Sequence, residues 1–200
     1  MTEATDDRIY DLRLRPKDLG VALIAALCLL GGWLLMQRTV ERTIAFQSEL
    51  TPLRLAYPAG WVEVPGAENI LLNVADPATP SAFKSFISVE NRPIDPASPP
   101  TLQTLLDRRV EQRQQLTGYH FLSDGEAEVA GVRALVSDYA YVAQPIDEAR
   151  RAALPVVVQA REYILLTADQ SYYVTMAAPE GQFAEASRQF DRVIASMQVQ

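Results

Sequence analysis

The chain has 200 residues and a formal net charge of −7, with 25 acidic side chains against 18 basic ones. This balance argues against a nucleic-acid-binding protein, because phosphate backbones are bound by clustered Lys and Arg. With one histidine, His120, and one cysteine, Cys28, the sequence offers no disulfide and no zinc site, and no Gly-rich phosphate loop follows a strand. We therefore expect no metal and no cofactor.

Residues 1–18 mix acidic and basic side chains and are predicted to form a short cytoplasmic tail. Residues 19–36 contain no charged side chain and no polar face. A helix of this length rises about 27 Å, close to the thickness of the hydrocarbon core of a bilayer. We expect a transmembrane signal anchor here. A cleaved signal peptide is the alternative, but residues 37–40 offer no small-x-small cleavage site.

The basic residues around the predicted span suggest its orientation. Four precede it and three follow it within a similar length, and the more positive side tends to stay in the cytoplasm. We therefore place the carboxy-terminal part on the outer, periplasmic or extracellular face of the cell membrane, held by a single pass. Ala22 and Ala26 have the spacing that lets two helices approach closely, but this spacing is common in alanine-rich anchors. A homo-oligomer is possible and has no further support.

Residues 37–51 are predicted to be a stalk. The stretch up to Leu50 lacks Gly and Pro, so the membrane helix could continue outward until Thr51-Pro52. Val40 and Ile44 would then share one face that docks on the domain or on a partner helix. A short spacer without such docking is the alternative.

Residues 52–200 are predicted to form one domain that mixes strands and helices. Alternating apolar residues and turn signals predict strands over residues 53–64 (interrupted at 58–60), 69–74, 83–91, 119–129, 132–143, 156–167 and 171–178. A helix is expected from the N-cap Thr101 to Leu116, with residues 107–109 and 111–113 on a solvated face. A closing helix over residues 182–197 carries a sheet-packing face formed by Phe183, Ala186, Phe190, Val193, Ile194 and Met197.

Strand runs separated from helices indicate an α+β fold rather than a parallel nucleotide-binding sheet. Four segments carry a family resemblance: LAYPAGW, GEAEVAGVRALVSDYAYV, AREYILLTADQSYYVTMAAP and FAEASRQFDRVIASMQV. Together they resemble the PsbP family, the extrinsic photosystem II fold shared with the Mog-type Ran-binding proteins and with bacterial membrane-tethered domains. The resemblance implies an antiparallel β-sheet with helices packed on its faces, a PsbP-like sandwich. No ion-retention or Ran-binding residue is carried over, and the family's members differ in function.

Two local patterns with potential chemistry have simpler explanations. His120 lies between aromatic residues in a predicted strand, where a half-buried, hydrogen-bonded imidazole is expected. The run Asp124-Gly125-Glu126-x-Glu128 loosely resembles a calcium loop but lacks the remaining ligands. Alternating acids on an exposed strand face explain it better. We therefore expect no catalytic residue and no enzyme.

Surface recognition remains as a role. The irregular segment 144–155 supplies the candidate partner contacts Ile146, Arg150, Arg151 and Leu154. We expect a membrane-anchored, extracytoplasmic accessory or interaction module that contacts a membrane complex or an envelope component. The alternative is a tethered small-ligand or ion-binding domain with a cleft between sheet and helix, lined by Tyr141, Tyr163 and Tyr173.

Overall fold

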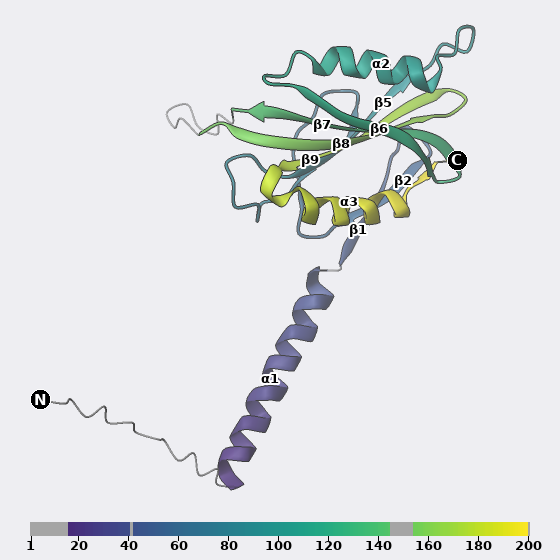
Figure 1. The fold of residues 1–200 in the computed structure, drawn as a ribbon. Helices are drawn as coiled ribbons and strands as arrows, with labels where there is room; N and C mark the ends of the chain where they lie inside the picture. The colour runs from purple at the N-terminus through teal and green to yellow at the C-terminus, as the bar shows by residue number, and fades with distance from the viewer. Residues whose placement is uncertain (1–15, 41, 145–153, 200) are drawn as a thin grey trace, which may run out of the picture. The chain divides into compact units, whose positions relative to one another are not determined.

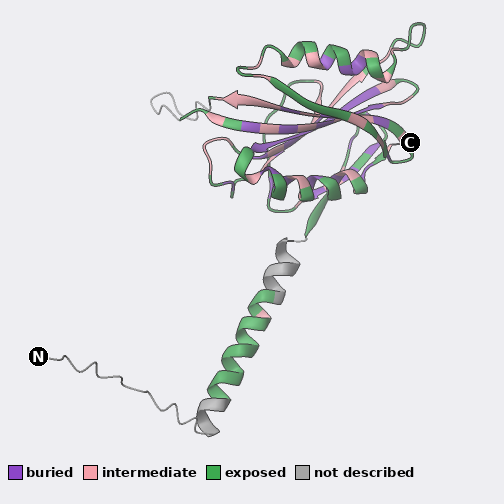
Figure 2. Ribbon diagram, viewed as in Figure 1, coloured by how far each residue is buried: buried purple, intermediate pink, exposed green. Residues whose placement is uncertain are grey.

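The computed structural model describes residues 16–40, 42–144 and 154–199, and the chain divides into two units, residues 1–41 and residues 42–200. The first unit contains α1 (Pro16–Val40). Its large apolar side chains between Val21 and Trp33 are exposed, as the green ribbon of α1 in Figure 2 shows. Over the described part of the chain, no helix is both long enough and apolar enough to cross a membrane.

The second unit is an α+β domain built on antiparallel strands (Figure 1). A seven-stranded sheet has the order β3-β4-β5-β9-β8-β7-β6, and a three-stranded sheet has the order β1-β2-β10. The large sheet consists of β3 (Val62–Glu63), β4 (Ile70–Ala75), β5 (Phe86–Pro93), β9 (Gln170–Pro179), β8 (Val156–Leu166), β7 (Val132–Ala143) and β6 (His120–Val129). The small sheet consists of β1 (Thr43–Gln47), β2 (Leu53–Pro58) and β10 (Gln198–Val199).

Two helices pack on opposite faces of the large sheet: α2 (Leu102–Arg113) and α3 (Phe183–Ser196), the latter preceded by the short helix η1 (Glu180–Gln182) (Figure 1). Thr101 is the N-cap of α2, since its Oγ1 accepts a hydrogen bond from the backbone N–H of Thr104 at 3.1 Å. Both predicted helices and this predicted cap are confirmed.

The largest apolar cluster lies between the large sheet, the small sheet and α3. Phe190 of α3 is fully buried there against the even-numbered residues of β9, among them Tyr172 and Val174. The odd-numbered residues of β9 point to the other face, where Tyr173 packs with Leu105 and Leu106 of α2. β9 is therefore buried on both faces, which explains its nearly continuous apolar sequence.

The structure corrects the predicted helical stalk. Residues 43–47 form β1, which pairs antiparallel with β2 from Thr43 opposite Pro58 to Gln47 opposite Arg54. Residues 43–47 form a strand rather than a helix because pairing with β2 satisfies their backbone N–H and C=O groups. The pairing also places Phe46 against the largest apolar cluster. The helix expected up to Leu50 is therefore wrong from Thr43 onward. β10, a two-residue strand, was not predicted.

Strand β6 is an edge strand of the large sheet and is mostly exposed. His120 is exposed on it, so the predicted half-buried imidazole is wrong. The acidic residues Asp124, Glu126 and Glu128 are exposed along the same strand, as predicted. β6 turns into β7 through Ala130 and Gly131, whose φ angles of 54° and 76° are typical of a two-residue hairpin turn.

Candidate functional site

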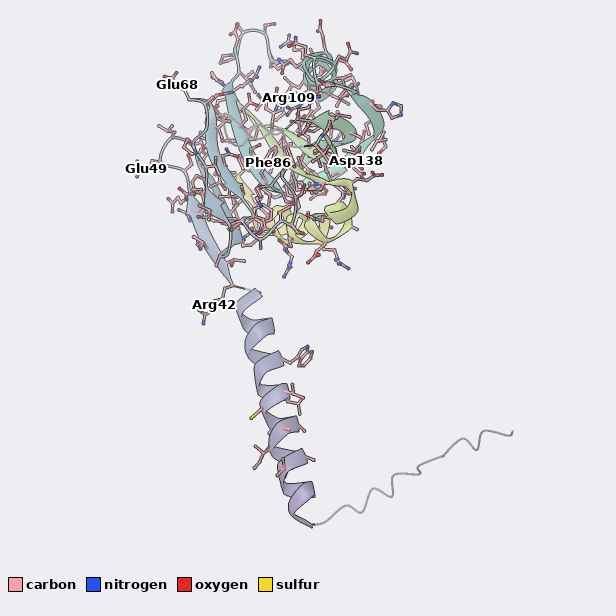
Figure 3. The ribbon with its side chains drawn as sticks, turned by 90° about the vertical axis from the view of Figure 1, so that its left-hand side faces the viewer. Arg42, Glu49, Glu68, Phe86, Arg109 and Asp138 are labelled. Carbon is pink, nitrogen blue, oxygen red and sulfur yellow. The ribbon has the colours of Figure 1, made fainter. Side chains whose placement is uncertain are left out.

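A cavity of about 430 Å³ lies beside α2, on the face of the large sheet that α2 covers. Two residues of α2, Arg109 and Arg113, form one side of it. Arg109 and Phe86, both labelled in Figure 3, come from α2 and β5. The other lining residues are Val64, Ile70, Asn73, Ala75, Lys84, Ser88, Glu90, Tyr139, Tyr141 and Thr175.

Glu162 is the buried carboxylate of this region. It stands on β8 between the apolar residues Ala160 and Ile164, which share its face of the strand, and only 1% of it is exposed. Its Oε1 accepts hydrogen bonds from Arg109 Nη2 at 2.8 Å, Arg113 Nη2 at 3.0 Å and Thr175 Oγ1 at 2.8 Å. These charge-assisted bonds compensate the cost of burying the carboxylate.

Arg109 joins Glu162 to a second carboxylate. It is 6% exposed, and its Nη2 also donates to Glu90 Oε2 at 2.8 Å. The other oxygen of Glu90 accepts from Asn69 Nδ2 at 2.6 Å and from Arg92 Nε at 2.7 Å. The Arg109 guanidinium also lies over the ring of Tyr173, 4.2 Å from its centroid. One side chain thus fixes α2 to strands β5, β8 and β9.

Arg113 lies one helical turn further along α2 and is less completely paired. Its Nη2 donates to Glu162, and its guanidinium carbon lies 5.5 Å from the ring centroid of Tyr139. Within the described residues, its Nε is buried and has no hydrogen-bond partner. Arg113 therefore lines the cavity, and its unpaired Nε is buried within the protein.

The pKa values of Glu162, Tyr139 and Tyr141 lie far from neutral pH. Burial raises the pKa of the Glu162 carboxyl, but Arg109 and Arg113 outweigh burial and hold that pKa below its ordinary value of 4.5. Burial also raises the pKa of the Tyr139 phenol, and it raises the pKa of Tyr141 to about 12. At neutral pH the carboxylate is therefore ionised and both phenols are protonated.

These pKa directions predict an acid-labile domain. A carboxyl whose pKa is lower in the folded state stabilises the fold above its ordinary pKa of 4.5, and this stability is lost as the pH falls through the folded pKa. We expect the free energy of unfolding to fall below pH 4.5 with a slope of up to about 1.4 kcal/mol per pH unit from this group alone. Urea unfolding at several pH values measures the slope.

The control for the acid slope is Glu162→Gln, which has no carboxyl at this position. We expect it to lack this part of the slope, whatever its absolute stability. An equal slope in both proteins below pH 4.5 would assign the acid lability to other carboxyls.

The residues predicted as site residues are not gathered in one place. Tyr141 lines the cavity and Tyr173 lies beneath Arg109, but Tyr163 is on the opposite face, 5.7 Å from Phe190 between ring centroids. The predicted cleft with all three tyrosines is therefore wrong. Leu154 is 84% exposed. The other three candidate partner contacts, Ile146, Arg150 and Arg151, lie outside the described residues.

The sequence interpretation also missed the two arginines. Both were assigned to the solvated face of the helix, whereas Arg109 is buried and Arg113 is half-buried. Their spacing carried a signal, because Arg109 follows Leu105 by four residues and Leu102 by seven, which places all three on one face. Asp107 and Arg108 are exposed as predicted. Among the described residues, no group of three or more His, Cys, Asp or Glu is arranged to hold a metal ion.

No protein-family model matches this sequence, and no curated protein matches it. Several solved structures share its fold. Cyanobacterial PsbP (CyanoP) from Synechocystis sp. PCC 6803 is similar with a TM-score of 0.55 and 15% identity, over 79% of this chain and 92% of that chain. LpqN from Mycobacterium tuberculosis is similar with a TM-score of 0.54 and 13% identity, over 78% and 90%.

The Ran-binding protein Mog1p from Saccharomyces cerevisiae is similar with a TM-score of 0.51 and 9% identity, over 79% of this chain and 95% of that chain. At such identities the likeness concerns the fold alone. The domain has the PsbP/Mog-like fold, and the resemblance found in the sequence is confirmed at this level.

Proposed function

We propose that this chain is a non-enzymatic binding module, an accessory protein anchored in the cell membrane with its folded domain on the outer face. The observation that carries the proposal is the buried ion-pair network of the candidate site, whose charged groups already pair with one another. Acid-base catalysis at neutral pH needs a group with a pKa near 7. Here the pKa of Glu162 is lowered and those of Tyr139 and Tyr141 are raised, so all three move away from that range.

The site is also built to be rigid. Glu162 and Glu90 each accept several hydrogen bonds, and Arg109 connects them across three strands and a helix. Breaking such a buried network costs several kcal/mol, so its groups are poorly suited to changing partners during a reaction. A rigid scaffold with an open cavity suits binding instead.

Anchoring is supported by the sequence of the first unit. Residues 19–36 carry no charge, and the large apolar side chains of α1 between Val21 and Trp33 are exposed. A row of exposed apolar side chains of this kind is unfavourable in water and favourable in lipid. The basic flank before the span supports an outer location for the domain.

Proteins with the same fold support a binding role. Mog1p is described as Ran-binding, and LpqN as involved in cell envelope biogenesis. For this chain we propose a membrane complex or an envelope component as the partner. We propose contacts through the segment that contains Ile146, Arg150, Arg151 and the exposed Leu154.

Co-purification in mild detergent tests the interaction. Tagged full-length protein is expected to return the same partner repeatedly, and Leu154→Asp is expected to lower the recovered partner about tenfold, because a charge would have to be buried in the interface. Leu50→Asp is the matched control, since Leu50 is 81% exposed in a different loop. Repeated recovery of the protein alone would contradict the interaction role, and an equal effect of both variants would contradict the assigned surface.

A tethered small-ligand binding domain is the second candidate function. The observation that favours it is the cavity beside α2, whose volume of about 430 Å³ lies within the usual range of small-molecule sites, about 300–1,000 Å³. Tyr141, one of the residues predicted for such a cleft, lines it.

A further inference from the structure

The cavity beside α2 has more positive than negative charge. Three cationic side chains line it, Lys84, Arg109 and Arg113, together with one carboxylate, Glu90. Glu162 lies directly behind the two arginines and adds a second negative charge. Glu90 and Glu162 pair with Arg92, Arg109 and Arg113, so within the described residues Lys84 is the lining cation without a carboxylate partner.

One of these cations keeps donors for a ligand. Lys84 is exposed and its Nζ donates one hydrogen bond, to the backbone oxygen of Thr79 at 2.9 Å, whereas an ammonium group has three hydrogens. Lys84 therefore keeps donors for a ligand, whereas the unpaired Nε of Arg113 is buried and not open to the cavity.

The two phenols add to this set of donors. Tyr139 and Tyr141 line the same cavity, and burial raises the pKa of both phenols, so each presents an O–H group at neutral pH. Their ring centroids lie 6.2 Å apart with the rings stacked at 28°. Their rings offer apolar surface next to the hydroxyl donors.

Another part of the lining is apolar. Val64, Ile70, Ala75 and Phe86 come from β4, β5 and the segment before β4, and they complete the lining. A fully polar ligand would leave this surface without a partner, and a purely apolar ligand would leave Lys84 without one. The ligand that fits both parts has an anionic head and an apolar body.

The unpaired cation selects the head group. One positive charge without a carboxylate partner, that of Lys84, is balanced by a monoanion. A dianion such as a phosphate monoester would bring a second negative charge close to Glu90 and Glu162, where repulsion is weakly screened. We propose that the cavity binds a small organic monocarboxylate with an apolar body. This inference deepens the second candidate function and rests on it, and it is independent of the proposed partner protein.

Calorimetric titration of the full-length protein in a nonionic detergent tests the proposal. The probes are benzoate, phenylacetate and hexanoate, each paired with its neutral amide, and phenyl phosphate serves as the dianion. We expect at least one carboxylate to bind about tenfold more tightly than its own amide, because only the carboxylate forms charge-assisted hydrogen bonds. Phenyl phosphate is expected to bind more weakly than the best carboxylate.

Two variants locate the binding site without touching the buried ion-pair network. Lys84→Gln removes the positive charge and Tyr141→Phe removes a hydroxyl donor from the cavity, and each is expected to weaken carboxylate binding about five- to tenfold. Arg133→Gln is the matched control for Lys84→Gln, because it changes the net charge equally in an exposed pair with Glu126 outside the cavity. It is expected to leave the affinity unchanged within about twofold.

Three results would overturn the proposal. The first is that no carboxylate binds better than its amide, and the second is that Arg133→Gln weakens binding as much as Lys84→Gln. The third is that phenyl phosphate binds more tightly than every carboxylate, which would show that the head group is wrong. Partner recovery in the co-purification experiment is measured separately, so failure here is distinguishable from failure of the interaction role.

Discussion

Replacing Glu162 with glutamine is expected to lower the free energy of unfolding by about 3–5 kcal/mol. The carboxylate is 1% exposed and accepts bonds from two arginines, of which Arg109 is itself buried. The variant leaves both guanidinium groups without their shared counter-charge and close to each other. Chemical denaturation monitored by circular dichroism gives the change in unfolding free energy.

The matched control for this prediction is Glu126→Gln. Glu126 also pairs with an arginine, Arg133, at 3.2 Å, but both side chains are more than 70% exposed. Such a pair contributes less than about 1 kcal/mol, because water screens it. A similar loss of stability in both variants, or no loss in Glu162→Gln, would mean that the buried network does not stabilise the fold.

Removing residues 1–41 is expected to release a folded, soluble domain from the membrane fraction. Among the described residues, the three apolar clusters are formed by residues between 46 and 199, so the fragment keeps this core. If the proposed anchor holds, the full-length protein is expected to stay with the membranes after alkaline carbonate extraction, because residues 19–36 would remain in lipid. Fractionation followed by immunoblotting measures both proteins, and thermal unfolding tests the fold of the fragment.

The exact starting residue matters for this fragment. A fragment of residues 42–200 keeps β1. A fragment of residues 53–200 lacks β1, and it therefore loses Phe46 and the five residues that pair with β2. We expect the shorter fragment to be less stable by about 2 kcal/mol, or about 4–8 °C in Tm. Full-length protein in the soluble fraction would contradict the anchor, and an unfolded 42–200 fragment would contradict a self-contained domain.

Most of the fold could be predicted from the sequence because its elements are long and locally encoded. Strands β6, β7, β8 and β9 alternate in polarity or are bounded by turn residues. Helix α2 begins directly after Thr101, which caps it. The two missed strands carry weaker local signals. β10 is two residues long and pairs with β2, which lies near the other end of the domain's sequence. β1 has a sequence that suits a helix equally well until β2 lies beside it.

The candidate site was harder to predict because it depends on burial of charged residues. A charged residue on a helix is usually solvated, so Arg109 and Arg113 were assigned to the surface. The informative residue was Glu162, an acid in a set of alternate β8 positions that is otherwise apolar: Val156, Val158, Ala160, Ile164 and Leu166. An acid at such a position requires a buried cation, and only the spacing of residues on α2 shows which arginines reach it.

The pairing of β2 with β10 has a consequence for biosynthesis. Arg54 lies opposite Gln198 and Leu53 opposite Val199, so a strand made early pairs with residues that are made much later. A ribosome releases the amino-terminal end first, and contacts so distant in sequence form late. Leu53, Leu55 and Tyr57, all buried in the finished domain, stay uncovered until α3 and β10 have been made. A cell that makes this protein therefore has to shield an apolar strand until these later elements emerge.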